Sequence, residues 1–288
     1  MTVVREALCE LGLSPPLSEA PLAGGSIHDV RLVQLEDGDR VVCKVGSGEN
    51  GLRMMQSEYR GITQLGDTGT IRVPHVYGLS EQAGATVLIM EHLPRSEGAD
   101  WIEAAHALAR LHACDAGDRY GSDEEVWLGG TQCDAVWCDT WPEYLGEHRL
   151  RPLLRDVASA KSVSGTSIHT IELLIDRLPK LIPARPRPSI LHGDLWSGNL
   201  HPAQGGVAVL DPACFIGDAW ADPAMTLLFG GVPSEFVEAW RERHDAQSDT
   251  PAVQERITVV QVMHLLNHVR LFGFGYTSRL MDTVSALL

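Results

Sequence analysis

Strand-type patterns of apolar residues predict a small antiparallel sheet in the first third of the chain. Residues 30–35 alternate apolar and polar side chains, and the run 41–45 is apolar except for Lys44. The turn 36–39 between them is acidic and contains a glycine, which is typical of a β-hairpin. A third apolar run, 86–90, is rich in β-forming residues and predicts another strand.

A helical spacing of apolar residues lies between these strands. Residues 51–66 predict a single helix whose apolar stripe consists of Leu52, Met55, Tyr59 and Ile62. The strand pattern stops near residue 92, and a proline follows at position 94. We therefore expect a compact N-terminal lobe over residues 1–92, made of a small antiparallel sheet and one helix.

The pattern after residue 92 is mainly helical. Residues 101–112 and 169–182 have helical spacing, and 256–272 is apolar on several sides, which predicts a buried helix. The segment 117–168 between them is irregular and rich in tryptophan and glycine. We expect a second, mainly helical lobe over 93–288, which gives a bilobal α+β fold.

Composition limits the class of protein. Hydrophobic residues make up 44% of the 288 residues and charged residues 21%, which is ordinary for a folded chain. The formal charge of −15 argues against nucleic acid and anionic membrane surfaces as partners. There is no apolar run long enough to cross a membrane, and the six cysteines include no C-x-x-C pair. We expect a cytoplasmic protein with reduced thiols, as a monomer or weak homodimer.

The segment 190–199, Ile-Leu-His-Gly-Asp-Leu-Trp-Ser-Gly-Asn, carries the strongest chemical signal. Asp194 and Asn199 stand five positions apart, and an apolar strand that follows ends on Asp211. Kinases use this arrangement for phosphoryl transfer. One carboxylate, Asp194, would hold an acceptor hydroxyl, while the oxygens of Asn199 and Asp211 would bind Mg²⁺. The alternative is an ordinary Gly-Asp turn, which needs none of the distant partners.

Lys44 is the second signal. The chain has only three lysines among its 23 lysines and arginines, and this one lies inside an apolar strand pattern. A compact ammonium there could contact the α- and β-phosphates of ATP and be positioned by Glu58 of the following helix. The ordinary alternative is an exposed lysine on an edge strand.

Two weaker patterns complete the candidates. The glycines before the first long strand, in the loop 24–29, could cover phosphates with backbone amides, although two glycines also form plain turns. His264 and His268 are four residues apart, but no glutamate follows the first one as in metalloprotease helices. We interpret these histidines as polar groups of the core or of a pocket.

Residues 191–199 resemble the catalytic loop of the fructosamine kinase (ketosamine kinase) family, within the aminoglycoside-phosphotransferase-like branch of the protein-kinase-like fold. Similar segments extend over most of the chain, at 24–27, 90–93, 137–141, 211–213, 228–231 and 266–268. The resemblance implies ATP- and Mg²⁺-dependent phosphorylation of a sugar hydroxyl on a ketosamine or glycated amine. An aminoglycoside, choline-like or other amino-alcohol acceptor, or a nucleotide-binding pseudokinase, are the alternatives.

The resemblance also assigns residues to roles. The catalytic residue is Asp194, and the metal ligands are Asn199 and Asp211. The implied ATP-binding residues are Gly24, Gly25, Ser26, Lys44, Glu58, Met90, Glu91 and Leu93. The candidate substrate contacts are His192, Trp196, Trp220, Asn267 and His268.

Two positions depart from the family pattern. Many members have a cysteine where this chain has Ser26, so no redox-sensitive disulfide is expected in that loop. Members usually read Gly-His-x-Glu-x-(Asp/Glu)-Leu-Ala after the second aspartate motif, whereas residues 217–224 lack both the histidine and the glutamate. Trp220 stands in place of that glutamate, so the usual sugar-side contacts do not carry over.

Overall fold

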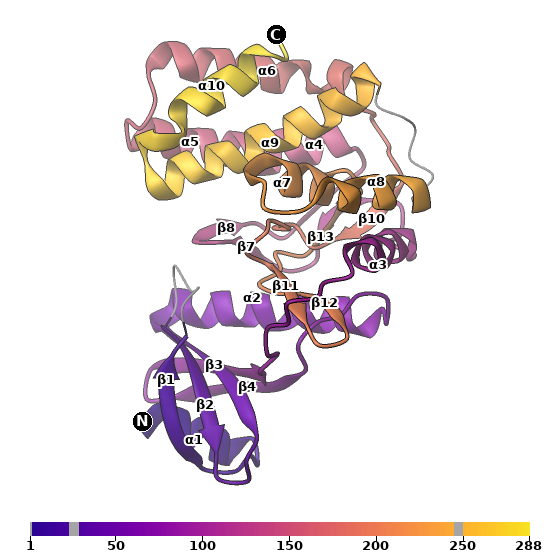
Figure 1. Cartoon of the computed structure of the whole chain (residues 1–288). Helices are drawn as coiled ribbons and strands as arrows, with labels where there is room; N and C mark the ends of the chain where they lie inside the picture. Colours follow the sequence, from indigo (N-terminus) through magenta and orange to yellow (C-terminus); the bar gives the residue numbers. More distant parts are fainter. Residues whose placement is uncertain (1, 23–28, 245–249) are drawn as a thin grey trace.

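The computed structural model describes residues 2–22, 29–244 and 250–288, and it has the expected bilobal α+β architecture. The N-terminal sheet, which has five strands, lies with its helices in the lower part of Figure 1, and a mainly helical part lies above it. The chain leaves the sheet at Glu91 and enters the next helix at Trp101. A domain boundary near residue 92 stays our proposal.

The N-terminal sheet has antiparallel neighbours throughout. Its order is β1 (Pro16–Pro21), β2 (Asp29–Leu35), β3 (Arg40–Ser47), β5 (Ala85–Glu91) and β4 (Val76–Gln82). The predicted hairpin is confirmed as β2 and β3, and the predicted strand at 86–90 is β5. The sequence pattern did not identify the two edge strands, β1 and β4.

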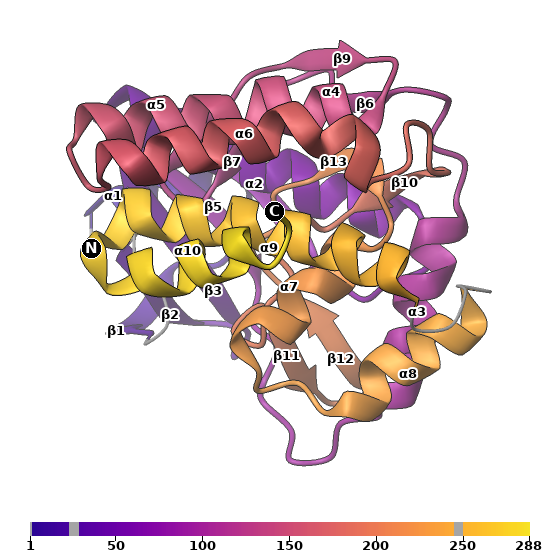
Figure 2. The ribbon, with the colours of Figure 1, turned by 90° about the horizontal axis from the view of Figure 1, so that it is seen from above.

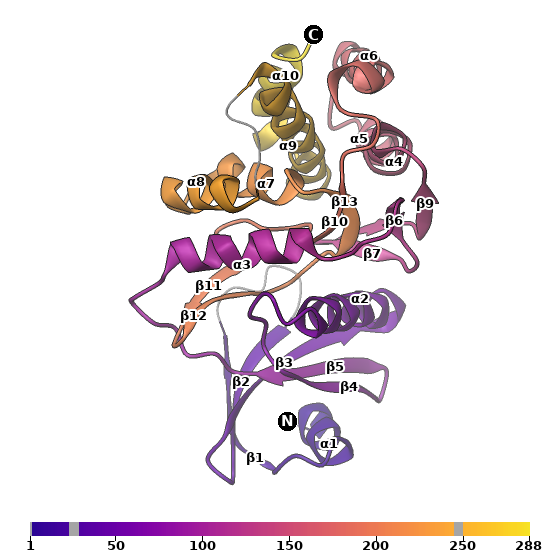
Figure 3. The same ribbon diagram turned by 90° about the vertical axis from the view of Figure 1, so that its right-hand side faces the viewer.

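Helices cover both faces of this sheet. The helix α2 (Gly48–Asp67) confirms the one predicted at 51–66 and buries Met55 and Ile62 on one face. The helix α1 (Thr2–Glu10) packs Val4 and Leu8 on the other face. Figure 3 shows the two helices on opposite sides of the strands. The prediction of a single N-terminal helix was wrong, because the outer face of the sheet also needs an apolar cover.

Alternation along β3 decides where its lysine points. Val41 and Cys43 belong to the apolar cluster under α1, while Val42 belongs to the cluster under α2. Successive side chains of a strand point to opposite faces, so Lys44 shares the α2 face with Val42. This places its ammonium on the side of the sheet that faces the second lobe.

The second lobe is mainly helical. Its helices are α3 (Trp101–Ala113), α4 (Trp141–Leu145), α5 (Arg151–Ser159), α6 (Gly165–Leu181), α7 (Ala221–Phe229), α8 (Ser234–Arg243), α9 (Pro251–Phe272) and α10 (Thr277–Ser285). A π-helical turn, Gly146–Leu150, joins α4 to α5, and a 3₁₀ turn, Phe274–Tyr276, precedes α10. The helices predicted at 101–112, 169–182 and 256–272 are confirmed as α3, α6 and α9.

The segment 117–168 is more regular than its sequence indicates. Besides α4 and α5 it contains four short strands: β6 (Tyr120–Ser122), β7 (Val126–Leu128), β8 (Thr131–Cys133) and β9 (Val136–Cys138). Strands β6 and β9 join β10 (Pro188–Leu191) and β13 (Phe215–Asp218) in the order β10-β13-β6-β9. β7 pairs with β8, and β11 (Leu200–Ala203) pairs with β12 (Gly206–Val209). Strands of three residues are too short for periodicity to reveal them.

The helix α9 is the centre of the second lobe. It packs against α5, α7 and α10, and Figure 2 shows it among these helices from above. Val259, Leu265 and Leu266 are fully buried. The prediction that this helix is buried is therefore confirmed. None of the described helices is long and apolar enough to cross a membrane.

The two lobes meet where α2 passes the segment after Asp211. A Cβ atom at Gly61 would lie 3.0 Å from Pro212 Cγ, so glycine permits this close approach. The Cys214 thiol also donates to the carbonyl oxygen of Gly61, with a sulfur–oxygen distance of 3.6 Å. The helix that carries Glu58 is thus packed directly on the chain that carries Asp211.

Candidate active site

The catalytic loop, residues 192–199, connects β10 to β11 through a turn that requires glycine. Gly193 has φ +82°, and a Cβ atom on it would lie 2.1 Å from the carbonyl oxygen of Ala213. Only glycine adopts this conformation without strain and without that collision. The His-Gly-Asp sequence therefore brings the loop against the chain after Asp211.

His192 supports this loop from inside. Its ring is fully buried, its Nδ1 atom accepts a hydrogen bond from the Asp194 backbone N–H at 3.2 Å, and its Nε2 atom donates to the Leu210 carbonyl oxygen at 2.9 Å. Burial lowers the pKa of His192, which keeps the ring in this neutral form. The prediction that His192 contacts substrate is corrected, because the ring is buried and both of its nitrogens are bonded to backbone groups of Asp194 and Leu210.

Asp222, at the start of α7, anchors the same loop. Its Oδ2 atom accepts from the backbone N–H of His192 at 2.8 Å, and its Oδ1 atom accepts from that of Gly193 at 2.9 Å. Its side chain is buried, which opposes ionisation, but hydrogen bonds led by the one from His112 hold the pKa of Asp222 below its ordinary value. A buried charged acceptor of this kind fixes the loop strongly.

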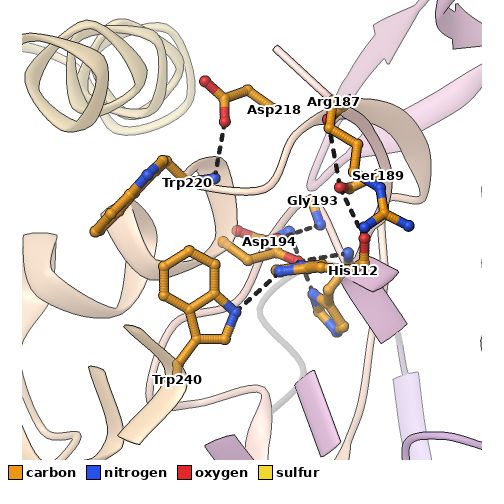
Figure 4. A network of polar contacts seen from close by, with 10 residues as sticks. His112, Arg187, Ser189, Gly193, Asp194, Asp218, Trp220 and Trp240 are labelled. Atoms are coloured by element: carbon orange, nitrogen blue, oxygen red, sulfur yellow. Dashed lines mark hydrogen bonds and ion pairs between the residues drawn. The ribbon is translucent and has the colours of Figure 1, made fainter. Parts of the chain in front are cut away.

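A second layer of polar contacts extends this anchor. His112 Nε2 donates to Asp222 Oδ2 at 3.1 Å, and His112 Nδ1 accepts from the Trp240 indole N–H at 3.0 Å. Figure 4 shows His112 between Trp240 and the catalytic loop. Sequence reasoning missed these three residues. The only signal for Asp222 was its match to the acidic position of the family pattern.

Asp194 and Asn199 meet inside the loop. The Asn199 amide Nδ2 donates to the Asp194 carbonyl oxygen at 2.8 Å and to Asp194 Oδ2 at 3.3 Å. Burial, together with the nearby charge of Asp211, raises the pKa of Asp194 to about 7. A carboxyl group with this proton affinity suits a base that acts near neutral pH.

Lys44 joins the two lobes electrostatically. Its Nζ atom lies 2.6 Å from Glu58 Oε1 and also binds Asp211 Oδ1. Burial alone would lower the pKa of Lys44, but the two carboxylates outweigh it and hold the pKa above its ordinary value. Lys44 is 7% exposed, so the alternative of an exposed edge lysine is wrong.

Asp211 has an unusual backbone conformation. Its φ angle is +53°, a backbone conformation that residues other than glycine rarely adopt. Non-glycine residues in such conformations concentrate at functional sites. Burial favours the neutral acid, but the contact with Lys44 outweighs it and lowers the pKa of Asp211. Its side chain is still 47% exposed, so an ionised carboxylate is presented to solvent beside Lys44.

The donor set at this site fits Mg²⁺. Because the Asn199 amide nitrogen is directed at Asp194, the Asn199 side-chain oxygen is the atom left for a cation. The Leu210 N–H donates to the Asn199 carbonyl oxygen at 2.9 Å, which ties Asn199 to the residue before Asp211. Mg²⁺ prefers oxygen ligands and is commonly held by one or two protein groups plus substrate phosphates. Within the described residues, His, Cys, Asp and Glu form no cluster of three or more that could bind a metal alone.

The three residues of segment 90–93 that we predicted to bind the nucleotide make contacts within the protein. Met90 is buried in the apolar cluster under α2. Glu91 accepts a hydrogen bond from the His75 backbone N–H at 3.1 Å, and the Leu93 carbonyl oxygen accepts from His201 at 2.9 Å. The Glu91 backbone N–H also donates to the His75 carbonyl oxygen at 2.8 Å, so these groups are committed within the fold. Gly24, Gly25 and Ser26 lie outside the described residues.

A pocket of about 400 Å³ opens beside the predicted base. It brings together side chains from the catalytic loop, α7, α9 and the turn after α9, among them Asp194, Trp196, Phe229, Asn267, His268 and Tyr276. Three of the five predicted substrate residues thus line one pocket with Asp194. The amide of Asn267 is already committed, since it donates to the Leu128 carbonyl oxygen at 3.3 Å and accepts from the Thr131 hydroxyl.

Trp220 is not among the described residues that line this pocket. It is 3% exposed, and its ring meets the Trp240 ring edge to face with centroids 4.8 Å apart. The expectation that Trp220 contacts substrate is corrected, because its large apolar ring is part of the core between α7 and α8. The neighbouring Asp218 is paired with Arg256 through contacts of 2.6 and 2.8 Å.

Comparison with known proteins gives a consistent family. The family model described as "Fructosamine kinase" matches residues 13–288. A probable ketoamine kinase of Synechocystis is 32% identical over 240 residues, which cover 82% of this chain and 79% of the relative. The mouse ketosamine-3-kinase is 29% identical and covers 93% of this chain and 94% of its own length.

Solved structures agree with the sequence matches. A putative fructosamine-3-kinase from Haemophilus somnus superposes with a TM-score of 0.88 at 27% identity, over 100% of this chain and 97% of the other. The gentamicin complex of the aminoglycoside phosphotransferase APH(2″)-IIa has a TM-score of 0.65 at 16% identity, over 99% and 94% of the two chains. The second likeness concerns the fold alone.

Proposed function

Because the chain belongs to the fructosamine kinase family, we propose that it transfers the γ-phosphoryl group of ATP to a sugar hydroxyl of a ketosamine. The position of Asp194 carries the proposal. Its side chain lines a pocket of about 400 Å³, accepts a hydrogen bond from Asn199, and lies near the charge of Asp211. An acceptor in the pocket and a phosphate held near Asp211 would therefore meet at the Asp194 carboxylate.

In the proposed reaction Asp194 accepts the proton of the acceptor hydroxyl as the hydroxyl oxygen attacks the γ-phosphorus. The bond between that phosphorus and the oxygen of the ADP leaving group breaks in line with the attack. Lys44 would contact the phosphates, held in place by Glu58. Asn199 and Asp211 would hold Mg²⁺, which would neutralise phosphate charge.

Positioning of the reacting groups supplies much of the rate acceleration in phosphoryl transfer. The loop that carries Asp194 is fixed by the buried carboxylate of Asp222 and by His192. Displacement of a reacting group by about 1 Å can cost about 100-fold in rate. These contacts therefore support a loop built for catalysis rather than for nucleotide binding alone.

An acceptor panel tests the proposal. The purified chain would be incubated with ATP, Mg²⁺ and a fructosamine, a ribulosamine, an aminoglycoside or an amino alcohol, and the products would be identified by mass spectrometry. We expect one phosphoryl group on the ketosamines, and product formation slower by about 100-fold or more with Asp194→Asn prepared in the same way. Turnover of the aminoglycoside or the amino alcohol alone would reject the proposed acceptor.

We also propose that the enzyme works in the cytoplasm as a monomer or weak homodimer. All six cysteines are free thiols, which fits a reducing compartment. Sedimentation at two protein concentrations would test the oligomeric state.

A further inference from the structure

Aromatic rings wall the pocket beside Asp194. The ring of His268 on α9 is at the centre of them, with its centroid 4.6 Å from Phe229, 5.0 Å from Tyr276 and 5.4 Å from Phe272. Phe272 and Tyr276 also contact one another, with centroids 6.1 Å apart. These four residues form a continuous aromatic wall, and all four line the pocket.

The histidine in this wall is an acceptor and carries no charge at neutral pH. His268 Nδ1 donates to the His264 carbonyl oxygen at 2.8 Å, so the ring proton is on Nδ1 and the Nε2 atom is free to accept. Burial lowers the pKa of His268, which keeps the ring neutral. The aromatic wall therefore offers ring faces and one hydrogen-bond acceptor.

Charged side chains are scarce around this pocket, although the chain has a formal charge of −15. Among the described residues that line it, Asp194 is the only acid, and lysine and arginine are absent. The remaining lining includes Leu128, Met225 and Leu271. A second cationic group on an acceptor would lose water here, and Asp194 is the only acid among the described lining residues. The Arg279 guanidinium lies over the Phe229 ring, 5.5 Å from its centroid, so it would repel a further positive charge at the wall.

We propose that this chain selects ketosamines whose amine carries an apolar, preferably aromatic, substituent, and that the aromatic wall is the subsite for it. The inference rests on the proposed function. With the sugar hydroxyl at Asp194, the ring faces would hold the single secondary ammonium by cation–π attraction and the apolar substituent by contact. Phe272 is 56% exposed and Trp196 is 40% exposed, so the mouth of the pocket is apolar as well.

Two fructose-derived ketosamines of similar length test this selection. One carries an N-benzyl group and the other an N-(4-aminobutyl) group, which adds a second cation. We expect kcat/KM for the benzyl compound to be higher by about tenfold or more, since even one methylene in an apolar pocket is worth about tenfold. Equal values, or a preference for the aminobutyl compound, would overturn the proposal.

A matched pair of variants locates the subsite. Phe272→Ala should reduce the benzyl-to-aminobutyl ratio of kcat/KM several-fold, mainly through a higher KM for the benzyl compound. Leu227→Ala removes an exposed apolar side chain of α7 outside the pocket lining and should leave the ratio unchanged. An unchanged ratio in Phe272→Ala, with a wild-type melting temperature, would show that the wall is not the subsite. Failure to phosphorylate any ketosamine would instead reject the proposed function.

Discussion

Asp194 combines a functional and a destabilising role at the residue scale. Its carboxyl group is held in a largely desolvated loop, which together with the charge of Asp211 raises its pKa to about 7. The same desolvation makes the ionised form costly in the folded protein. Activity and stability should therefore respond to Asp194 in opposite directions.

Asp194→Asn should lower kcat by about 100-fold or more, because the base that orients the acceptor hydroxyl is lost. The same variant should melt at a higher temperature than wild type at pH 8 and at a similar temperature at pH 4. The folded-state pKa lies above the unfolded value, so wild type loses stability as pH rises from about 4 to about 7. Melting curves without Mg²⁺ would check this; a constant difference across the pH range would contradict it.

Lys44→Met should lower kcat/KM for ATP by about 100-fold, since it removes the cation shared by Glu58 and Asp211. Lys180→Met is the matched control, because Lys180 is exposed on α6 and should leave the kinetics unchanged. Steady-state rates at varied ATP would distinguish the two variants. A wild-type KM and kcat in Lys44→Met would show that the ion pairs of Lys44 with Glu58 and Asp211 are structural only.

At the scale of elements, sequence patterns predicted what is long and periodic. The strands β2, β3 and β5 and the helices α2, α3, α6 and α9 follow from runs of alternating or helical apolar residues. The strands of 117–168 were missed because three residues show no period. The helix α1 was missed because it is only nine residues long, although it covers a whole face of the sheet.

The helices α3, α7 and α8 together hold the catalytic loop. His112 on α3 links them, because it bonds both Asp222 of α7 and Trp240 of α8. His112→Phe keeps a ring in the core but removes the N–H donated to Asp222, so kcat should fall about tenfold while KM for ATP stays unchanged. His112→Gln restores a donor and should recover most of kcat. If both variants lose activity equally, or KM alone changes, the network does not position the loop.

At the scale of the whole molecule, the site was predictable in part. Asp194, Asn199 and Asp211 stand in one short stretch of sequence with a recognisable motif, and Lys44 was marked by its strand. The aromatic wall was not predictable as a unit, because α7, α9 and the turn before α10 bring its rings together only in the folded chain. Motif residues carry the chemistry, and the packing of helices defines the acceptor.

The helical lobe should also make the protein sensitive to acid. Burial lowers the pKa of His264 on α9 to about 3 and that of His244 to about 4. Both values lie below the ordinary value of 6.5, so the unfolded chain binds protons that the folded chain excludes. The folded protein therefore loses the stability contributed by these histidines as pH falls from about 6.5 toward 4. Asp194 has the opposite effect, because its contribution increases as pH falls.

His264→Gln should weaken this dependence, because a buried group that does not titrate replaces one that must stay neutral. The change in melting temperature between pH 7.5 and 4.5 should be smaller in this variant than in wild type. His169→Gln is the control, since the His169 side chain is 71% exposed. Because only the slope with pH is compared, a uniform loss of packing in His264→Gln does not affect the result. Equal slopes in wild type and both variants would show that His264 does not contribute to the loss of stability in acid.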